Sequence, residues 1–249
     1  MNKAVGIIPA RWNSTRFPGK QLHLIASKPL LLRVLEQCRA AKNLDSVIIA
    51  TDDMRIAEAA FDWGAEVALT SPRHQSGTDR VAEIARKTKQ FAFVINIQGD
   101  EPLIDPRLID RLVEKLRSDR QIDIVTAAHP FENPADASSP HQVKVVVDVS
   151  GYALYFSRAA IPYPRNPSNV KHLRHQGIYG FRRDALLQFV KWKRGPLERA
   201  ESLEQLRALE NGVNVHVLLT RHGSPGVDTL ADAGALERKL ARAQGRTRS

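Results

Sequence analysis

The chain contains one cysteine, Cys38, among its 249 residues. A single thiol excludes an internal disulfide framework and a zinc site built from several cysteines. Because Cys38 lies in an apolar stretch with helical spacing, we expect it to be a buried thiol.

Long apolar runs are also absent, and no stretch approaches the roughly 18 apolar residues that a membrane-spanning helix needs. The first residues lack the basic and then apolar pattern of a secretion signal. Hydrophobic residues make up 43% of the chain and charged residues 26%, which is ordinary for a globular protein. We therefore expect a cytoplasmic protein that does not insert into a membrane.

Acidic residues are the scarcer charged class, since 37 lysines and arginines against 27 aspartates and glutamates give a net charge of +10. Such an excess favours nucleic acid, an anionic membrane surface or a polyanionic small substrate as the partner. Aromatic residues are only 6%, and no strand combines them with basic residues in the way that stacks nucleic-acid bases. We therefore favour a small polyanionic substrate, with nucleic-acid binding as the remote alternative. Part of the excess charge lies in a basic C-terminal segment that contains Arg238, Lys239, Arg242, Arg246 and Arg248.

Three cations gather in one loop near the start of the chain. Residues 4–8 read as a buried parallel strand, which Pro9 ends. Arg11, Arg16 and Lys20 follow, in the place where open α/β sheets bind ligands. Their side chains, with backbone N–H groups of the turn, suit several negative oxygens at once. We predict a phosphate-binding loop, and the alternative is a solvated basic loop.

Strands and helices alternate through the first half of the chain, which predicts a mostly parallel sheet with helices on both faces. The second half is richer in strands, and Ser150-Gly151 predicts a tight turn between two of them. We expect one α/β domain over residues 1–249 with a smaller β-rich region at about 124–182. The expected strands are 4–8, 47–51, 66–69, 91–97, 124–129, 143–148, 152–157, 176–181 and 213–219, and the expected helices are 30–38, 55–63, 81–87, 106–116, 184–192, 200–210 and a terminal helix after 229.

Polar residues follow several of these strands. Asp52 and Asp53 are expected to cap the helix after them. The small polar residues of 70–80 suit a polar ring, although a plain cap by Thr78 or Asp79 explains them nearly as well. Asp100 and Glu101 put two carboxylates at a strand end, where a hard metal ion is the natural partner.

Several motifs, in order along the chain, carry a resemblance to a known family. They include Ile8-Pro9-Ala10-Arg11, Ser14-Thr15-Arg16-Phe17-Pro18-Gly19-Lys20, Ala50-Thr51-Asp52-Asp53, Ser76-Gly77-Thr78-Asp79-Arg80, Asn96-Ile97-Gln98-Gly99-Asp100-Glu101-Pro102 and Gly226-Val227-Asp228-Thr229, with others at 143–146, 153–158, 161–163, 177–179 and 201–207. From about Val5 to the terminal helix the chain resembles the 3-deoxy-manno-octulosonate cytidylyltransferases.

The resemblance implies a Rossmann-like α/β fold of the nucleotide-diphospho-sugar transferase type. It also implies a magnesium-dependent reaction that joins CTP to the sugar acid 3-deoxy-D-manno-octulosonate (Kdo), giving CMP-Kdo and diphosphate for lipopolysaccharide biosynthesis. A homodimer is implied too. A cytidylyltransferase for another sugar acid, such as 8-amino-Kdo or sialic acid, remains the alternative.

The family's functional positions fall on residues of this sequence in three groups. Catalysis is implied for Arg11, Lys20, Asp100 and Asp228, of which Asp100 and Asp228 match the magnesium ligands. CTP binding is implied for Arg11, Ser14, Arg16, Lys20, Ser76, Gly77, Thr78, Asp79 and Asp100, and sugar-acid binding for Gln98, Arg158, His175, Tyr179, Glu204 and Gln205. The chain departs from the family's usual residues at Asn13, Gln21 and Ser27, where Gly or Ala, Pro and Gly are common.

Overall fold

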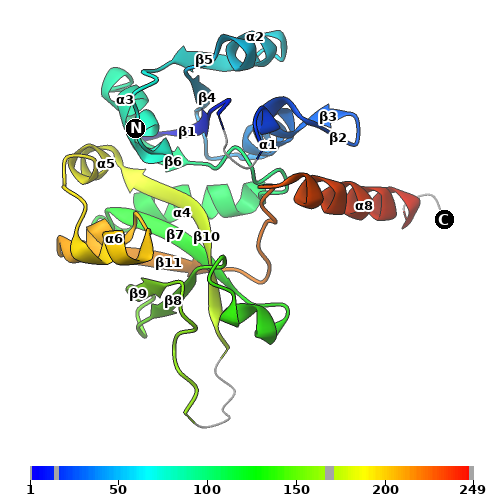
Figure 1. Cartoon of the computed structure of the whole chain (residues 1–249). Coiled ribbons are helices and arrows are strands. Elements are labelled where there is room, and N and C mark those ends of the chain that lie inside the picture. Colours follow the sequence, from blue (N-terminus) through cyan, green and yellow to red (C-terminus); the bar gives the residue numbers. More distant parts are fainter. Residues whose placement is uncertain (1, 14–16, 166–170, 247–249) are drawn as a thin grey trace. The chain divides into compact units, whose positions relative to one another are not determined.

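The computed structural model of the chain describes residues 2–13, 17–165 and 171–246, with the side chains of 243–246 left out (Figure 1). The chain divides into two compact units. We call residues 5–88, 96–110 and 224–249 the N-terminal unit, and residues 1–4, 89–95 and 111–223 the β-rich unit. Among the helices of the described part, none is long and apolar enough to cross a membrane.

The N-terminal unit contains the parallel strands β1 (Lys3–Ala10), β4 (Ser46–Thr51) and β5 (Glu66–Leu69), with β4 in the middle. Ile7, Ile8 and Ile49 are fully buried, as expected for apolar runs covered on both faces. The helices α1 (Leu30–Ala40), α2 (Met54–Asp62) and α3 (Gly77–Lys87) alternate with these strands. The alternation predicted for this half of the chain is confirmed, and Cys38 is buried in α1.

A short hairpin, β2 (Leu24–Ile25) and β3 (Lys28–Pro29), lies beside α1 and was not predicted (Figure 1). Its turn residues Ala26 and Ser27 have φ of +47° and +63°, a region that favours glycine. Its strand β2 packs with the terminal helix α8 (Leu230–Arg246), and β3 packs with α1, which also contacts the short helix η1 (Lys20–Leu22). Their shared apolar cluster consists of Phe17, Ile25, Leu30, Val227, Ala233 and Leu236.

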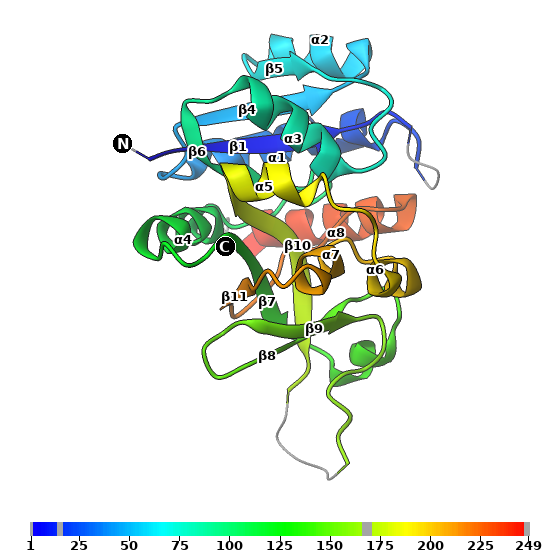
Figure 2. The ribbon, with the colours of Figure 1, turned by 90° about the vertical axis from the view of Figure 1, so that its left-hand side faces the viewer.

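The β-rich unit contains a mixed sheet in the order β11 (Val215–Leu219), β7 (Ile124–Pro130), β10 (Leu173–Arg182) and β6 (Phe91–Asn96). The strands β8 (Lys144–Val147) and β9 (Ala153–Ser157) form an antiparallel ribbon that pairs with β10 (Figure 2). Gly151, at φ +84°, confirms the predicted tight turn between them. The remaining helices are α4 (Pro106–Ser118), η2 (Pro134–Ser138), α5 (Arg183–Phe189), α6 (Pro196–Glu201) and α7 (Leu206–Glu210). The mixed, mostly parallel α/β fold expected from the sequence is confirmed.

The single helix predicted at 200–210 is wrong. The chain leaves α6 at Ser202, whose φ of +51° is left-handed, and begins α7 only at Leu206. A buried ion pair joins the two helices, because Arg207 donates to Glu198 at 2.7 and 2.6 Å. The charged residues of this segment thus form an ion pair between two short helices and do not line one continuous helix.

Candidate functional site

Lys20 is the centre of a charged cluster in the N-terminal unit. Its Nζ lies 2.7 Å from Asp100 Oδ2 and 3.1 Å from Asp228 Oδ1, and it also donates to the carbonyl of Val227 at 3.2 Å. Burial by itself lowers the pKa of this lysine, but Asp100 and Asp228 outweigh burial, so the net pKa is raised. Lys20 is therefore a charged ammonium held between two carboxylates.

The turn before Lys20 is held by a tryptophan. Gly19, at φ +70°, donates its N–H to the carbonyl of Trp12 at 3.0 Å, and a Cβ at this glycine would lie 3.0 Å from the indole ring. The guanidinium of Arg55 stacks on Trp12 with 3.5 Å to the ring centroid. Arg55 in turn pairs with Asp53, which caps α2 as predicted. The basic loop is thus anchored at both of its ends.

The two carboxylates come from segments that are bonded to each other. The N–H of Val227 donates to the carbonyl of Asp100 at 2.9 Å. Asp228 lies just before the last helix, where Asp232 Oδ2 accepts from the N–H groups of Asp228 and Thr229 at 3.1 and 2.9 Å and the Thr229 hydroxyl accepts from the N–H of Asp232 at 3.2 Å. The side chains of Asp100 and Asp228 are 28% and 47% exposed, so both carboxylates remain open to a ligand.

This donor set fits a hard divalent cation. Asp100 and Asp228 already enclose one positive charge, and carboxylate oxygens are the ligands that Mg²⁺ takes from proteins. Among the described residues no group of three or more His, Cys, Asp or Glu side chains is placed to hold a metal. A magnesium ion held by Asp100 and Asp228 would complete its coordination with water and phosphate oxygens, as is usual for this ion.

The loop predicted to meet a nucleobase leads into α3. Ser76 caps this helix, with Asp79 as the reciprocal partner of a capping box, so the alternative cap by Thr78 or Asp79 is wrong. Arg11 Nη1 donates to the carbonyl of Gln75 at 3.4 Å, which brings the basic loop beside this one. The capping box occupies the side chains of Ser76 and Asp79 and also their backbone N–H groups.

Residues behind this loop are buried and polar. Arg80 has no exposed surface, donates to Thr70 Oγ1 and lies 3.1 Å from a carboxylate oxygen of Asp52. Asp52 is thus a partner for Arg80, and Asp53 alone caps the helix. The amide of Asn96 donates to Thr78 Oγ1 at 3.3 Å, and Gln98 donates to Asn96 at 3.5 Å.

In the β-rich unit, His175 and Tyr179 lie together on β10. The His175 ring is 5.4 Å from the ring of Tyr179 and meets Phe156 edge-on at 5.0 Å. Burial lowers the pKa of His175 to about 3. Burial, followed by the charge of Glu204, raises the pKa of Tyr179. Both side chains are therefore neutral near pH 7.

Arg158 lies at the end of β9 and is partly occupied by backbone carbonyls. Its Nε donates to Glu201 at 2.7 Å, Nη1 to Pro140 at 3.0 Å and Nη2 to Ser202 at 3.4 Å. A guanidinium has five N–H groups, so two remain for a carboxylate. The nearby Gln205 is buried and Glu204 is half-buried and pairs with Arg207 at 3.4 Å.

Lys144 supports this region from within. It is fully buried, and its Nζ donates to the carbonyls of Ser139, Gln142 and Arg158 at 2.9, 2.6 and 2.5 Å. Burial lowers the pKa of this lysine. The ammonium thus joins the loop before β8 to the end of β9, where Arg158 lies.

We predict that Lys144→Met lowers the free energy of unfolding by about 2–4 kcal/mol, because three carbonyls lose their donor in a buried place. Urea denaturation of the purified variant measures the change, and Lys191→Met, at an exposed lysine of the same unit, is the matched control. Equal stability of the two variants would contradict this role for Lys144.

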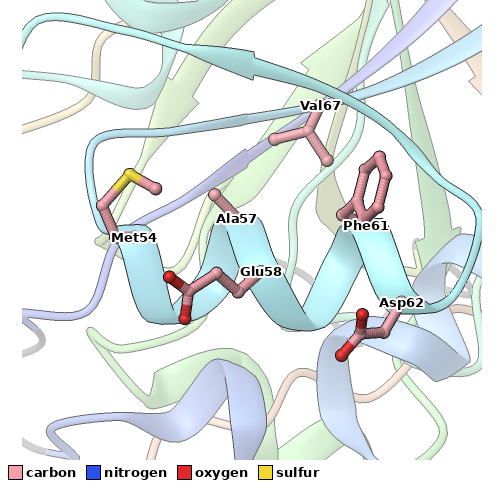
Figure 3. Close-up of a pocket in the computed structure, with 6 residues that line it drawn as sticks. All are labelled: Met54, Ala57, Glu58, Phe61, Asp62 and Val67. Carbon is pink, nitrogen blue, oxygen red and sulfur yellow. The ribbon is translucent and has the colours of Figure 1, made fainter.

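An apolar groove on α2 is a separate feature (Figure 3). Its walls are mostly the apolar side chains Met54, Ala57, Phe61 and Val67, with the carboxylates Glu58 and Asp62 at its border. Among the described residues that line it there is no cation, so this groove is unsuited to a triphosphate.

The structure brings Lys20, Asp100 and Asp228 together and places Arg11 beside the 76–79 loop. It brings His175 beside Tyr179 and places Arg158 against Glu201 and Ser202. The predicted residues Ser14 and Arg16 lie outside the described residues, as does Arg248, and the side chain of Arg246 is not described. Lys144, Glu201 and Val227 lie in motifs that carry the family resemblance, but the sequence assigned them no role, because the contacts that define their roles are made with residues distant in the chain.

Comparison with known proteins gives a consistent result. Residues 5–216 match the family model described as Cytidylyltransferase. A protein of Solibacter usitatus is 47% identical over 95% of this chain and 94% of its own length, and one of Fusobacterium nucleatum is 44% identical over 91% and 92%. Both are named 3-deoxy-manno-octulosonate cytidylyltransferase.

Solved structures agree with these relatives. One described as CMP:2-keto-3-deoxy-manno-octonic acid synthetase complexed with CTP has a TM-score of 0.94 at 40% identity, over 97% of this chain and 100% of that one. A 4-diphosphocytidyl-2C-methyl-D-erythritol synthase from Anaerococcus prevotii, at 13% identity and a TM-score of 0.66, shares the fold alone.

Proposed function

Because the chain belongs to the 3-deoxy-manno-octulosonate cytidylyltransferase family, we propose that it transfers CMP from CTP to Kdo and releases diphosphate. The observation that carries this proposal in the structure is the Lys20 ammonium, held at 2.7 and 3.1 Å between Asp100 and Asp228. It places a buried cation and two carboxylates at the end of a basic loop. This combination suits a nucleoside triphosphate with its metal ion.

The reaction transfers one nucleotidyl group, CMP. The anomeric hydroxyl of Kdo attacks the α-phosphorus and gives up its proton to water, a new oxygen–phosphorus bond forms, and the bond between the α-phosphorus and the bridging oxygen breaks as diphosphate leaves. Such a transfer needs little covalent help from the protein, and its cost lies mainly in positioning and in the charge of the phosphates. Lys20 and Arg11 supply positive charge for those oxygens.

Asp100 and Asp228 would hold the magnesium ion. When bound, that ion neutralises phosphate charge and orients the phosphate oxygens. Lys20, which lies between the same two carboxylates, keeps their negative charges paired and adds positive charge near the phosphates.

We propose that polar residues of the β-rich unit bind the sugar acid. Arg158 retains donors for a carboxylate, and His175, Tyr179, Glu204 and Gln205 offer hydrogen-bonding groups for hydroxyls. A closely related sugar acid such as 8-amino-Kdo would meet the same groups. We also propose that the protein is cytoplasmic and that it forms a homodimer. Sedimentation of the purified protein tests the homodimer.

Release of diphosphate from CTP plus Kdo, coupled to a pyrophosphatase, tests the proposed function. No diphosphate above the Kdo-free blank would overturn it. The same assay with 8-amino-Kdo and with sialic acid identifies the preferred acceptor, since the highest kcat/KM marks the substrate.

In this assay we predict that CTP is preferred over UTP by roughly tenfold to a few hundredfold in kcat/KM, because exchanging the ring amine for a carbonyl mispairs one hydrogen bond at the 76–79 loop. A protein truncated after Leu240 is the control. It keeps the apolar cluster and loses the end of α8 with the last arginines, so its CTP preference should be unchanged at low and high salt. Equal use of CTP and UTP would contradict base reading by this loop.

A further inference from the structure

Thr126 lies on β7 opposite an irregularity in β10. The strand pairing passes from Gln176 opposite Ala127 directly to Tyr179 opposite Thr126, so two residues of β10 have no partner on β7. The Thr126 side chain is fully buried at this point. Its hydroxyl oxygen lies 2.7 Å from the carbonyl of Ile178, 3.2 Å from that of Gln176 and 3.0 Å from His175 Nε2.

These three contacts determine which ring nitrogen of His175 carries the hydrogen. A hydroxyl has one hydrogen, and the two carbonyls can only accept. The hydrogen therefore points toward Ile178, the nearer carbonyl, with Gln176 beside it. The Thr126 oxygen is then left as an acceptor, so Nε2 of His175 must be the donor.

The other ring nitrogen is consequently an acceptor. His175 is neutral, because burial holds its pKa at about 3, and a neutral imidazole carries a hydrogen on only one nitrogen. With Nε2 bonded to Thr126, Nδ1 keeps its lone pair. The rings of Phe156 and Tyr179, at 5.0 and 5.4 Å, limit rotation of the imidazole. The ring is thus fixed in both orientation and tautomer.

We propose that Thr126 is a positioning residue that holds His175 as the Nε2–H tautomer, so that Nδ1 accepts a hydrogen bond from a hydroxyl of the sugar acid. This inference rests on the proposed function, in which His175 belongs to the sugar-acid site. Thr126 itself does not touch the substrate. It determines that His175 presents an acceptor, and therefore that the acceptor substrate must supply a hydroxyl there.

Steady-state kinetics of Thr126→Val and Thr126→Ser test the inference. Valine keeps the shape but cannot accept from Nε2, so KM for Kdo should rise roughly three- to tenfold, the value of one hydrogen bond. KM for CTP should stay unchanged, and Thr126→Ser, which keeps the hydroxyl, should restore KM for Kdo. Unchanged KM for Kdo in a folded Thr126→Val protein would overturn the proposal.

A double-mutant cycle separates positioning from simple support of the strand. If Thr126 acts through His175, Thr126→Val should raise KM for Kdo no further in a protein that already carries His175→Ala. An equal rise in both backgrounds would overturn the proposal, because the effect would then bypass the imidazole.

The tautomer can be read without any change at Thr126. The ¹⁵N spectrum of wild-type protein labelled at histidine should show His175 with a protonated Nε2 and an unprotonated Nδ1, the signal being assigned by its loss in His175→Ala. The opposite pattern would overturn the inference even if Thr126→Val failed to fold. Absence of diphosphate release by the wild-type protein would overturn the proposed function, while the spectrum would still decide the tautomer.

Discussion

Asp100→Asn and Asp228→Asn should each lower kcat for diphosphate release by about 10²- to 10³-fold at saturating Mg²⁺, the usual effect of losing one group that stabilises transition-state charge. Each substitution removes a formal negative charge while keeping the size of the side chain. Both carboxylates would hold the magnesium ion, and each also accepts from Lys20, at 2.7 and 3.1 Å. Replacing the carboxylate by an amide weakens both the binding of the magnesium ion and the ion pair with Lys20.

The measurement is the initial rate of diphosphate release over a magnesium titration, with circular dichroism to establish folding. Asp62→Asn, at an exposed aspartate at the end of α2, is the matched control and should keep normal turnover. A folded Asp100→Asn or Asp228→Asn protein with near-normal kcat would remove that residue from the proposed metal site.

Lys20→Met should have an effect of similar size on kcat/KM for CTP, about 10²- to 10³-fold, because it deletes a buried cation proposed to face the phosphates. A second result follows from the geometry. Lys20 and a metal ion compete for the same carboxylates, so Lys20→Met should bind Mn²⁺ or Mg²⁺ more tightly than wild type when no nucleotide is present.

Isothermal titration with the metal alone measures the second effect, and steady-state kinetics in CTP measure the first. Lys28→Met, at a partly exposed lysine of the same unit that pairs with Glu36, is the control for a lost positive charge. Unchanged CTP kinetics in folded Lys20→Met would favour the alternative that this loop is merely solvated and basic.

The parts of the fold predicted from the sequence are those with a strong local pattern. Short apolar runs rich in β-branched residues, such as Val47–Ala50, favour buried strands, and Asp53 lies where a helix cap is needed. The hairpin at Leu24–Pro29 was not predicted, because strands of two residues are too short to show an alternation of apolar and polar residues. The helix break at Ser202 was not predicted, because it depends on a left-handed backbone conformation and on an ion pair between two helices.

The charged cluster around Lys20 also has a part that local patterns predict and a part that they do not. The basic residues of the N-terminal loop and the carboxylates after a strand predicted phosphate and metal chemistry, and the family resemblance supplied Asp228. The contacts themselves were beyond local patterns, because Lys20 bonds Val227 and Asp228 across more than 200 residues. Lys144 and Thr126 have partners that only the folded strands reveal. Long-range satisfaction of buried polar groups is the part that a sequence pattern does not encode.

The ammonium of Lys20 also affects the stability of the folded protein when no ligand is bound. Two neighbouring carboxylates repel each other, and many metal sites fold only when the ion arrives. Here the chain carries its own counterion for Asp100 and Asp228. A chelator should therefore stop turnover without unfolding the protein. In a cell with little magnesium, the enzyme would lose activity while the amount of folded protein stayed unchanged.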